Sequence, residues 1–354
     1  MIQAEGIRAA FVPYGAAISD LFINDTHGVE RDIVLGWDNA SYYSIDKQHN
    51  HLGSVPGPYA NRIKNSSFEL DGETYQLIPN DWNNNDTLHG GPNGWDYRNW
   101  TVVAYTPDSI TFSLFDTDGA EGFPGDRIAY AQYSVTPYSW HIAISAISLT
   151  KRTPIMLTSH PYWNLDGYQN PATADALDHE LYLPFSGTRI GLDSIEIPTG
   201  DIVGIQPGDV HDWWQAPKRL GQDIDRLAEE NCGGPCEGLN VQREGYDNAY
   251  LINREAGGNY DWREKGPVAT LASPWSGIQV DIFTDQDGFQ VYSCNTLNSE
   301  LKSFPLCVHI TIHHADHNPR HHVPEEDPRS LRQPQPPTYR RPAQLLRPRS
   351  AGLH

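Results

Sequence analysis

Residues 128–149, with the sequence IAYAQYSVTPYSWHIAISAISL, contain two runs in which apolar and polar residues alternate over part of their length. A period of two puts successive side chains on opposite faces of a strand, so 128–135 and 140–149 are predicted strands. The residues between them, Thr136-Pro-Tyr-Ser139, are typical of a turn. The stretch therefore predicts a β-hairpin.

Further strands are expected on both sides of this hairpin. Phe68-Glu-Leu70 and Glu73-Thr-Tyr-Gln-Leu77 flank Asp71-Gly72, a pair that adopts the positive φ angles of a tight turn. Other short strand candidates lie at 155–159, 179–183, 249–252, 268–271, 278–283 and 289–293.

Helical periodicity is nearly absent from the sequence. Only residues 218–230 place apolar side chains, Leu220, Ile224 and Leu227, on one helical face. Many short strands with few helices predict an all-β fold, a large antiparallel β-sandwich.

The composition is that of a globular and strongly acidic protein. The chain has 354 residues, 38% of them hydrophobic, which is enough to bury a sizeable core. Its formal net charge of -20 repels the phosphates of nucleic acids and the headgroups of anionic lipids. We therefore expect no nucleic-acid partner, no membrane partner and a neutral small molecule as ligand.

The sequence as written lacks the features of a membrane or exported protein. No run approaches the roughly 20 apolar residues that span a bilayer, and residues 1–10 lack the apolar stretch of a signal peptide. A cytoplasmic monomer or dimer is expected, and secretion stays open if the true N-terminus lies upstream. The sequons at Asn24, Asn65, Asn85 and Asn99 are weak evidence for secretion.

Four cysteines, Cys232, Cys236, Cys294 and Cys307, are too few for a disulfide scaffold. Free thiols in loops are expected, with the alternative that Cys232 and Cys236 close a small loop in an oxidising compartment. Their spacing does not match a zinc site, and we predict no metal.

The character of the chain changes after about residue 300. Residues 301–354 hold seven arginines and one lysine against four acidic residues, and nine of the 27 prolines. Such a segment does not easily bury an apolar face, so we predict a β-sandwich over residues 1–300 and an irregular or disordered tail over 301–354. The abrupt change suggests an altered reading frame or a mispredicted exon, with the last strands of the sandwich missing.

Several motifs follow one another in a fixed order. They are Gly57-Pro-Tyr-Ala-Asn61-Arg62-Ile63, Leu88-His89-Gly-Gly-Pro-Asn-Gly-Trp95-Asp96, Thr158-Ser-His160-Pro-Tyr-Trp-Asn164-Leu-Asp-Gly167, Gly245-Tyr-Asp247-Asn248 and Thr284-Asp-Gln-Asp-Gly-Phe-Gln290-Val-Tyr292. In this order they resemble the motifs of the aldose 1-epimerase (galactose mutarotase) family. The resemblance spans roughly residues 7–296.

This resemblance implies a galactose mutarotase-like supersandwich that interconverts the α and β anomers of a free hexose such as galactose or glucose. Opening the ring requires one proton delivered to the ring oxygen and another removed from the anomeric hydroxyl. One general acid and one general base suffice, so no cofactor is needed. A histidine, with an unperturbed pKa of about 6.5, suits the acid.

The resemblance also implies roles for individual residues. By its place in its motif, His160 is the expected acid, and His89 is expected to hydrogen-bond the ring oxygen or a neighbouring hydroxyl. The expected hydroxyl-binding residues share planar donors or acceptors and are Asn61, Arg62, Asp247 and Gln290.

The aromatic residues of the same motifs have two open interpretations. Trp95, Tyr162 and Trp163 are candidates for apolar faces against a sugar ring. Tryptophans of a sandwich are mostly buried, so for Trp95 and Trp163 core packing is an equal alternative. Outside their motifs, the histidines would also be read as hydrogen-bonded core or rim residues.

The family resemblance further implies a catalytic glutamate beyond the Gln290 motif, and the sequence does not supply it. No glutamate lies between Glu300 and Glu325, and neither of these two stands in a matching motif. The base is therefore unknown, which predicts impaired activity. The alternative is a non-catalytic carbohydrate-binding protein on the same fold. A hexose 6-phosphate enzyme is disfavoured because the charge is so negative and no extra basic cluster accompanies Arg62.

Overall fold

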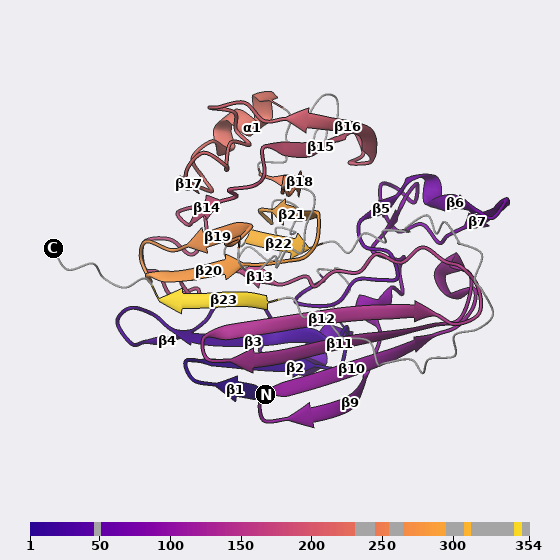
Figure 1. Cartoon of the computed structure of the whole chain (residues 1–354), viewed down its shortest axis with the longest axis horizontal. Helices are drawn as coiled ribbons and strands as arrows, with labels where there is room; N and C mark the ends of the chain where they lie inside the picture. Colours follow the sequence, from indigo (N-terminus) through magenta and orange to yellow (C-terminus); the bar gives the residue numbers. More distant parts are fainter. Residues whose placement is uncertain (46–50, 231–244, 255–264, 295–307, 313–342, 349–354) are drawn as a thin grey trace, which may run out of the picture.

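The computed structural model describes residues 1–45, 51–230, 245–254, 265–294, 308–312 and 343–348. Its largest sheet is antiparallel and joins strands from distant parts of the chain (Figure 1). Within the described residues this sheet has nine strands. In spatial order they are β17 (Lys218–Arg219), β14 (Glu180–Tyr182), β19 (Ala269–Ala272), β20 (Ile278–Ile282), β23 (Ala343–Pro348), β12 (Ser139–Ser148), β11 (Arg127–Thr136), β10 (Ser109–Asp116) and β9 (Thr101–Thr106).

Smaller sheets complete the described part of the molecule. A six-stranded sheet has the order β13 (Tyr162–Trp163), β22 (Val308–Ile312), β21 (Gly288–Tyr292), β18 (Asp247–Leu251), β15 (Thr188–Leu192) and β16 (Pro198–Gly204). A four-stranded sheet consists of β1 (Ile2–Ala4), β2 (Ile7–Val12), β3 (Ala17–Asn24) and β4 (Glu30–Asp32). Two pairs remain, β5 (Arg62–Ile63) with β8 (Thr87–Leu88) and β6 (Ser67–Leu70) with β7 (Glu73–Gln76).

Helices in the described residues are short. Besides α1 (Ile224–Glu230) they are single 3₁₀ turns at Ala40–Ser44, Lys64–Ser66, Trp95–Tyr97 and Ala120–Gly122. Within the same residues, no helix has the length and apolar character that crossing a membrane requires. The prediction of an all-β sandwich is confirmed.

The hairpin predicted at 128–149 lies at the centre of the core. β11 and β12 pair from Arg127 and Ser148 down to Thr136 and Ser139. Tyr133 of β11 is fully buried and stacks on Phe11 of β2, with 4.5 Å between ring centroids. Its hydroxyl donates a hydrogen bond of 2.9 Å to the carbonyl oxygen of Ala16. These contacts pack the four-stranded sheet against β10 to β12, as Figure 1 shows in the lower half of the view.

Three local predictions meet different outcomes. The second hairpin is confirmed as β6 and β7, and Asp71 and Gly72 have φ angles of 55° and 84°. The helix expected at 218–230 begins only at Ile224, because Lys218–Arg219 pairs with β14 as β17. Residues 155–159 form no strand, since only Met156 makes an isolated bridge, to Tyr59.

Two strands lie inside the segment that was expected to be an irregular tail. β22 pairs with β13 and β21, and β23 pairs with β12 and β20. The expectation of an irregular tail is therefore wrong for these two segments, because short runs can pair through their backbones whatever the mean composition around them. The other residues of 301–354 lie outside the described residues, so the irregular tail stays a prediction there.

One cysteine departs from the expectation of free thiols. Cys294, buried just after β21, is disulfide-bonded. Cys232, Cys236 and Cys307 lie outside the described residues. Spacing along the chain did not reveal this bond, because a disulfide depends on distances between chain segments in the fold.

Two strand pairings bring the sequence motifs together. Arg62 of β5 lies opposite Leu88 of β8, which makes Asn61 and His89 neighbours. In the six-stranded sheet, Asp247 pairs with Tyr292 and Ala249 pairs with Gln290. Residues directly opposite in an antiparallel pair share a face, so Asp247 and Gln290 lie on the same side of the sheet.

A buried histidine, His179, forms a hydrogen bond with the backbone of the segment that carries the His160 motif. The backbone N–H of Leu165 donates to Nε2 of His179, at 2.8 Å, just before β14 begins. Burial lowers the pKa of His179 from 6.5 to about 4, and the nearby carboxylates of Asp166, Asp175 and Asp178 only partly oppose this shift. His179 is therefore neutral near pH 7 and acts as an acceptor.

This histidine predicts a loss of stability in mild acid. Between about pH 6.5 and pH 4, His179 is protonated in the unfolded state and neutral in the folded state. The free energy of unfolding therefore falls as pH drops through that window. The fall attributable to this group is on the order of 3 kcal/mol. Urea denaturation at pH 7, 6, 5 and 4 measures it. In His179→Gln the free energy of unfolding should change less with pH, whereas the control His27→Gln, at an exposed site, should keep the wild-type pH dependence. An unchanged pH dependence in His179→Gln would contradict the role assigned to His179.

Candidate functional site

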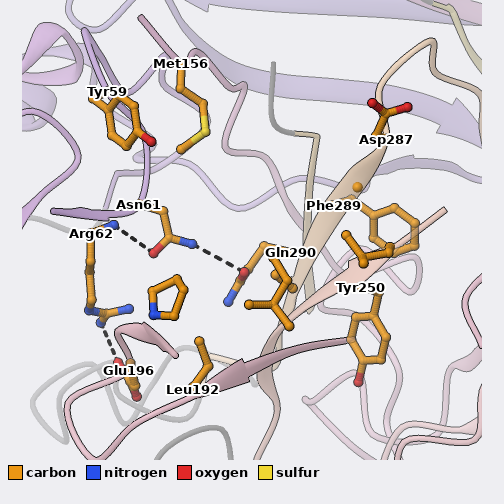
Figure 2. A pocket seen from close by; sticks show the side chains of 15 residues that line it. Tyr59, Asn61, Arg62, Met156, Leu192, Glu196, Tyr250, Asp287, Phe289 and Gln290 are labelled. Carbon is orange, nitrogen blue, oxygen red and sulfur yellow. Dashed lines mark hydrogen bonds and ion pairs between the residues drawn. The ribbon is translucent and has the colours of Figure 1, made fainter. Parts of the chain in front are cut away.

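A cavity of about 280 Å³ opens between β5, the β15–β16 connection and β21. Its walls are mostly apolar, with a few polar groups that converge from different elements (Figure 2). This combination is typical of a small-molecule site. The lining residues are Tyr59, Asn61, Arg62, Met156, Ile190, Leu192, Glu196, Pro198, Ala249, Tyr250, Leu251, Asp287, Gly288, Phe289 and Gln290.

Arg62 is held at this cavity by two carboxylates. Its Nε donates to Asp81 Oδ2 at 2.7 Å, and a terminal nitrogen lies 2.5 Å from Glu196 Oε2. The Arg62 side chain is 11% exposed and that of Glu196 only 2%, so water screens their attraction weakly. The guanidinium is thus fixed in place and its charge is already compensated.

Asn61 and His89 exchange two hydrogen bonds. The Asn61 N–H donates to Nδ1 of His89 at 3.0 Å, and the His89 N–H donates to the carbonyl oxygen of Asn61 at 3.1 Å. Because Nδ1 accepts, the neutral His89 ring carries its proton on Nε2. Gly90 follows with φ of 86°, and a Cβ there would lie 2.1 Å from the carbonyl oxygen of Gly57, so the turn after His89 requires glycine.

A chain of side-chain hydrogen bonds leads from Asn61 across to the six-stranded sheet. Asn61 Nδ2 donates to Gln290 Oε1 at 3.4 Å, and Gln290 Nε2 donates to Asp247 Oδ1 at 2.6 Å. Figure 2 shows Asn61 between Arg62 and Gln290 on one side of the cavity. The four predicted hydroxyl-binding residues are therefore neighbours.

His160 joins the same region through its ring. Its ring centroid lies 5.4 Å from that of His89, and the side chain is nearly buried. The backbone fixes its position, because the His160 N–H donates to Ser54 and its carbonyl oxygen accepts from Gly53. The structure thus brings together the six predicted catalytic and hydroxyl-binding residues, although Asp247 and the two histidines do not line the cavity itself.

A third histidine, which the sequence analysis did not single out, completes a cluster. The His51 ring centroid lies 4.5 Å from that of His89 and 5.5 Å from that of His160. Its Nδ1 lies 2.5 Å from Oδ2 of Asp96, whose carboxylate is fully buried. Glu196 was likewise not predicted from the sequence. Neither residue stands in a local pattern that points to a site, since their partners are distant in the sequence.

The aromatic candidates are corrected by their burial. Trp95 is 1% exposed and donates its indole N–H to Asp116 at 2.8 Å, and Trp163 is fully buried with its ring 6.2 Å from that of Trp140. Neither lines the cavity, because both indoles fill the core. Tyr162 lies behind His160, with 5.0 Å between the ring centroids, and is also buried.

Comparison with known proteins finds relatives along most of the chain. The profile of the family described as aldose 1-epimerase matches residues 1–323. A probable aldose 1-epimerase of Arthroderma benhamiae is 38% identical over 318 residues, which cover 85% of this chain and 69% of that protein. The galactose mutarotase of Sus scrofa is 30% identical over 85% of this chain and 78% of its own length. A solved structure, the GalM/aldose epimerase homologue from C. elegans, has a TM-score of 0.73 at 27% identity and covers 98% of this chain and 96% of its own.

Because the ion pair between Arg62 and Glu196 is buried, we expect its loss to lower the free energy of unfolding more than the loss of an exposed ion pair does. Glu196→Ala should lower the free energy of unfolding by about 1.5–3 kcal/mol, because it removes the buried ion-pair partner of Arg62. Glu30→Ala is the matched control. Glu30 also lies 2.5 Å from an arginine, Arg8, but its side chain is 46% exposed, so about 1 kcal/mol or less is expected. Chemical denaturation at pH 7 compares the two, and equal losses would contradict the role of burial.

Proposed function

The chain belongs to the aldose 1-epimerase family, and from this membership we propose that it interconverts the α and β anomers of a free hexose such as galactose or glucose. The observation that carries the proposal is the placement of His89 and His160 with their rings 5.4 Å apart, beside the linked side chains of Asn61, Gln290 and Asp247. A sugar next to this group would meet both a proton donor and several hydroxyl-binding groups.

The proposed reaction starts with His160 as the general acid. Its imidazolium gives a proton to the ring oxygen, the bond between that oxygen and C1 breaks, and the anomeric hydroxyl loses its proton as the carbonyl forms. Rotation about the bond between C1 and C2 then presents the other carbonyl face, and the reverse steps close the ring. His89, with its proton on Nε2, is suited to donate a hydrogen bond to a sugar oxygen.

Arg62, Asn61, Gln290 and Asp247 bind the sugar hydroxyls in this proposal. Asn61 and Gln290 line the cavity with amides that both donate and accept, and Asp247 orients Gln290 by accepting a hydrogen bond from it. Apolar wall residues such as Leu192 and Phe289 would contact the C–H faces of the sugar ring.

The charges around the cavity favour a neutral sugar. Among the described lining residues, Arg62 is the cation, and Glu196 and Asp287 are acidic. Because Glu196 and Asp81 already neutralise Arg62, an anionic sugar finds no free positive charge there. This supports a free hexose over a hexose 6-phosphate.

A non-catalytic carbohydrate-binding protein is the second candidate. It is favoured by one observation, the absence of a glutamate in the expected part of the sequence after Gln290. The two functions share the same site and differ in whether a second proton-transfer group acts on the anomeric hydroxyl.

Polarimetry of freshly dissolved α-galactose and α-glucose tests the proposal. We expect the wild-type chain to accelerate mutarotation over buffer, and His160→Gln to lower kcat by about 10²–10⁴, because glutamine cannot donate the proton. His27→Gln, an exposed histidine in the β3–β4 turn, is the matched control and should keep full activity. Saturable sugar binding without any acceleration would favour the second candidate.

Discrimination by charge is tested with galactose and galactose 6-phosphate as competing ligands. We expect the phosphate ester to bind at least about tenfold more weakly, equivalent to about 1.4 kcal/mol, because the positive charge of Arg62 is already paired with Glu196 and Asp81. Glu196→Gln should narrow the difference by removing one negative charge. Equal affinities of the wild type for both ligands, measured by calorimetry, would contradict the neutral-sugar assignment.

A further inference from the structure

The pair of His51 and Asp96 has the arrangement of an oriented proton acceptor. Asp96 Oδ2 lies 2.5 Å from His51 Nδ1, and the Tyr97 hydroxyl lies 3.1 Å from the same nitrogen. The Asp96 side chain is fully buried, and that of His51 is 12% exposed. An ionised carboxylate accepts hydrogen bonds only, so Nδ1 carries a proton and Nε2 of the neutral ring is an acceptor.

The position of His51 ties this pair to the sugar site. Among the described residues, the His51 ring contacts Asp96, Tyr97, His89 and His160. The ring therefore packs against both histidines that the proposed function uses. The hydrogen bonds of His51 among these residues use Nδ1, which leaves Nε2 to act on a ligand.

We propose that His51 is the general base of this site and that Asp96 is its positioning residue. The inference rests on the proposed function. Nε2 of His51 takes the proton of the anomeric hydroxyl, so the O–H bond breaks and an N–H bond forms. The electron pair released becomes the second bond of the C1 carbonyl. At the same time His160 gives its proton to the ring oxygen as the bond from that oxygen to C1 breaks, and the charges balance.

Asp96 supports both states of His51 in this step. It holds the ring orientation while the ring is neutral, and its negative charge stabilises the imidazolium that forms when Nε2 accepts the proton. The same division of labour between a buried carboxylate and an imidazole operates in hydrolase triads.

Other groups near the site are less suited to be the base. Asp247 accepts a hydrogen bond from Gln290, and Glu196 is paired with Arg62, so both carboxylates are already engaged. Burial raises the pKa of the Tyr162 phenol well above its ordinary value, so Tyr162 stays protonated near pH 7. His51 combines an accepting nitrogen with a partner that stabilises the protonated ring.

The test compares three variants of the full chain with the wild type by polarimetry, together with galactose binding by calorimetry and thermal melts. His51→Gln fills the same space but cannot carry a proton between groups. We expect kcat to fall by about 10²–10⁴ with galactose affinity nearly unchanged. Asp96→Asn should lower kcat as well, because the amide cannot stabilise the imidazolium. His51→Ala should regain part of its kcat when free imidazole is added.

The outcomes separate this inference from the proposed function. A wild type that does not accelerate mutarotation overturns both. An active wild type with an equally active His51→Gln overturns only the role of His51. If His51→Gln loses kcat, galactose affinity and melting temperature together, and imidazole does not rescue His51→Ala, the role of His51 is structural. That result would also overturn its assignment as the general base. Retained affinity with imidazole rescue supports the general base.

Discussion

The exchange of two hydrogen bonds between Asn61 and His89 is the contact on which the arrangement of the site depends. It joins the strand pair β5 and β8 just where each strand gives way to a loop. Both residues have positive φ angles, 64° and 53°, which non-glycine residues adopt only when their surroundings hold them. Because Arg62 follows Asn61 and the His89 ring touches His160, one local contact sets the positions of a cation and two imidazoles.

Much of the fold and of the site was predictable because the signals are local. The alternation at 128–149 and the Asp71-Gly72 turn each report on neighbouring residues, and both hairpins were found where these signals lie. The six candidate site residues were also proposed from the sequence, since each stands in a motif whose order is distinctive. The structure adds that Asn61, Gln290 and Asp247 are linked by hydrogen bonds.

The missed features depend on contacts between distant segments. The candidate role of His51 depends on its contact with Asp96, which lies 45 positions away in the sequence. That of Glu196 depends on its ion pair with Arg62 of β5. For Trp95 and Trp163 the residue type is compatible with a core or a binding surface, and only packing decides. The strands β22 and β23 were hidden because a mean composition over residues 301–354 masks runs of five or six residues, although Val308-His-Ile-Thr-Ile312 is rich in β-branched side chains.

The place of β23 between β12 and β20 has a consequence for how the chain folds. Neighbours in this sheet come from residues near 140, near 280 and near 345, so their pairing closes very large loops. Such a topology has a high contact order, and high contact order slows folding. Until residues 343–348 have been synthesised, the facing edges of β12 and β20 have no intervening strand. A newly made chain therefore presents open edges to other chains during its synthesis, which is the period when protection by chaperones has the greatest effect.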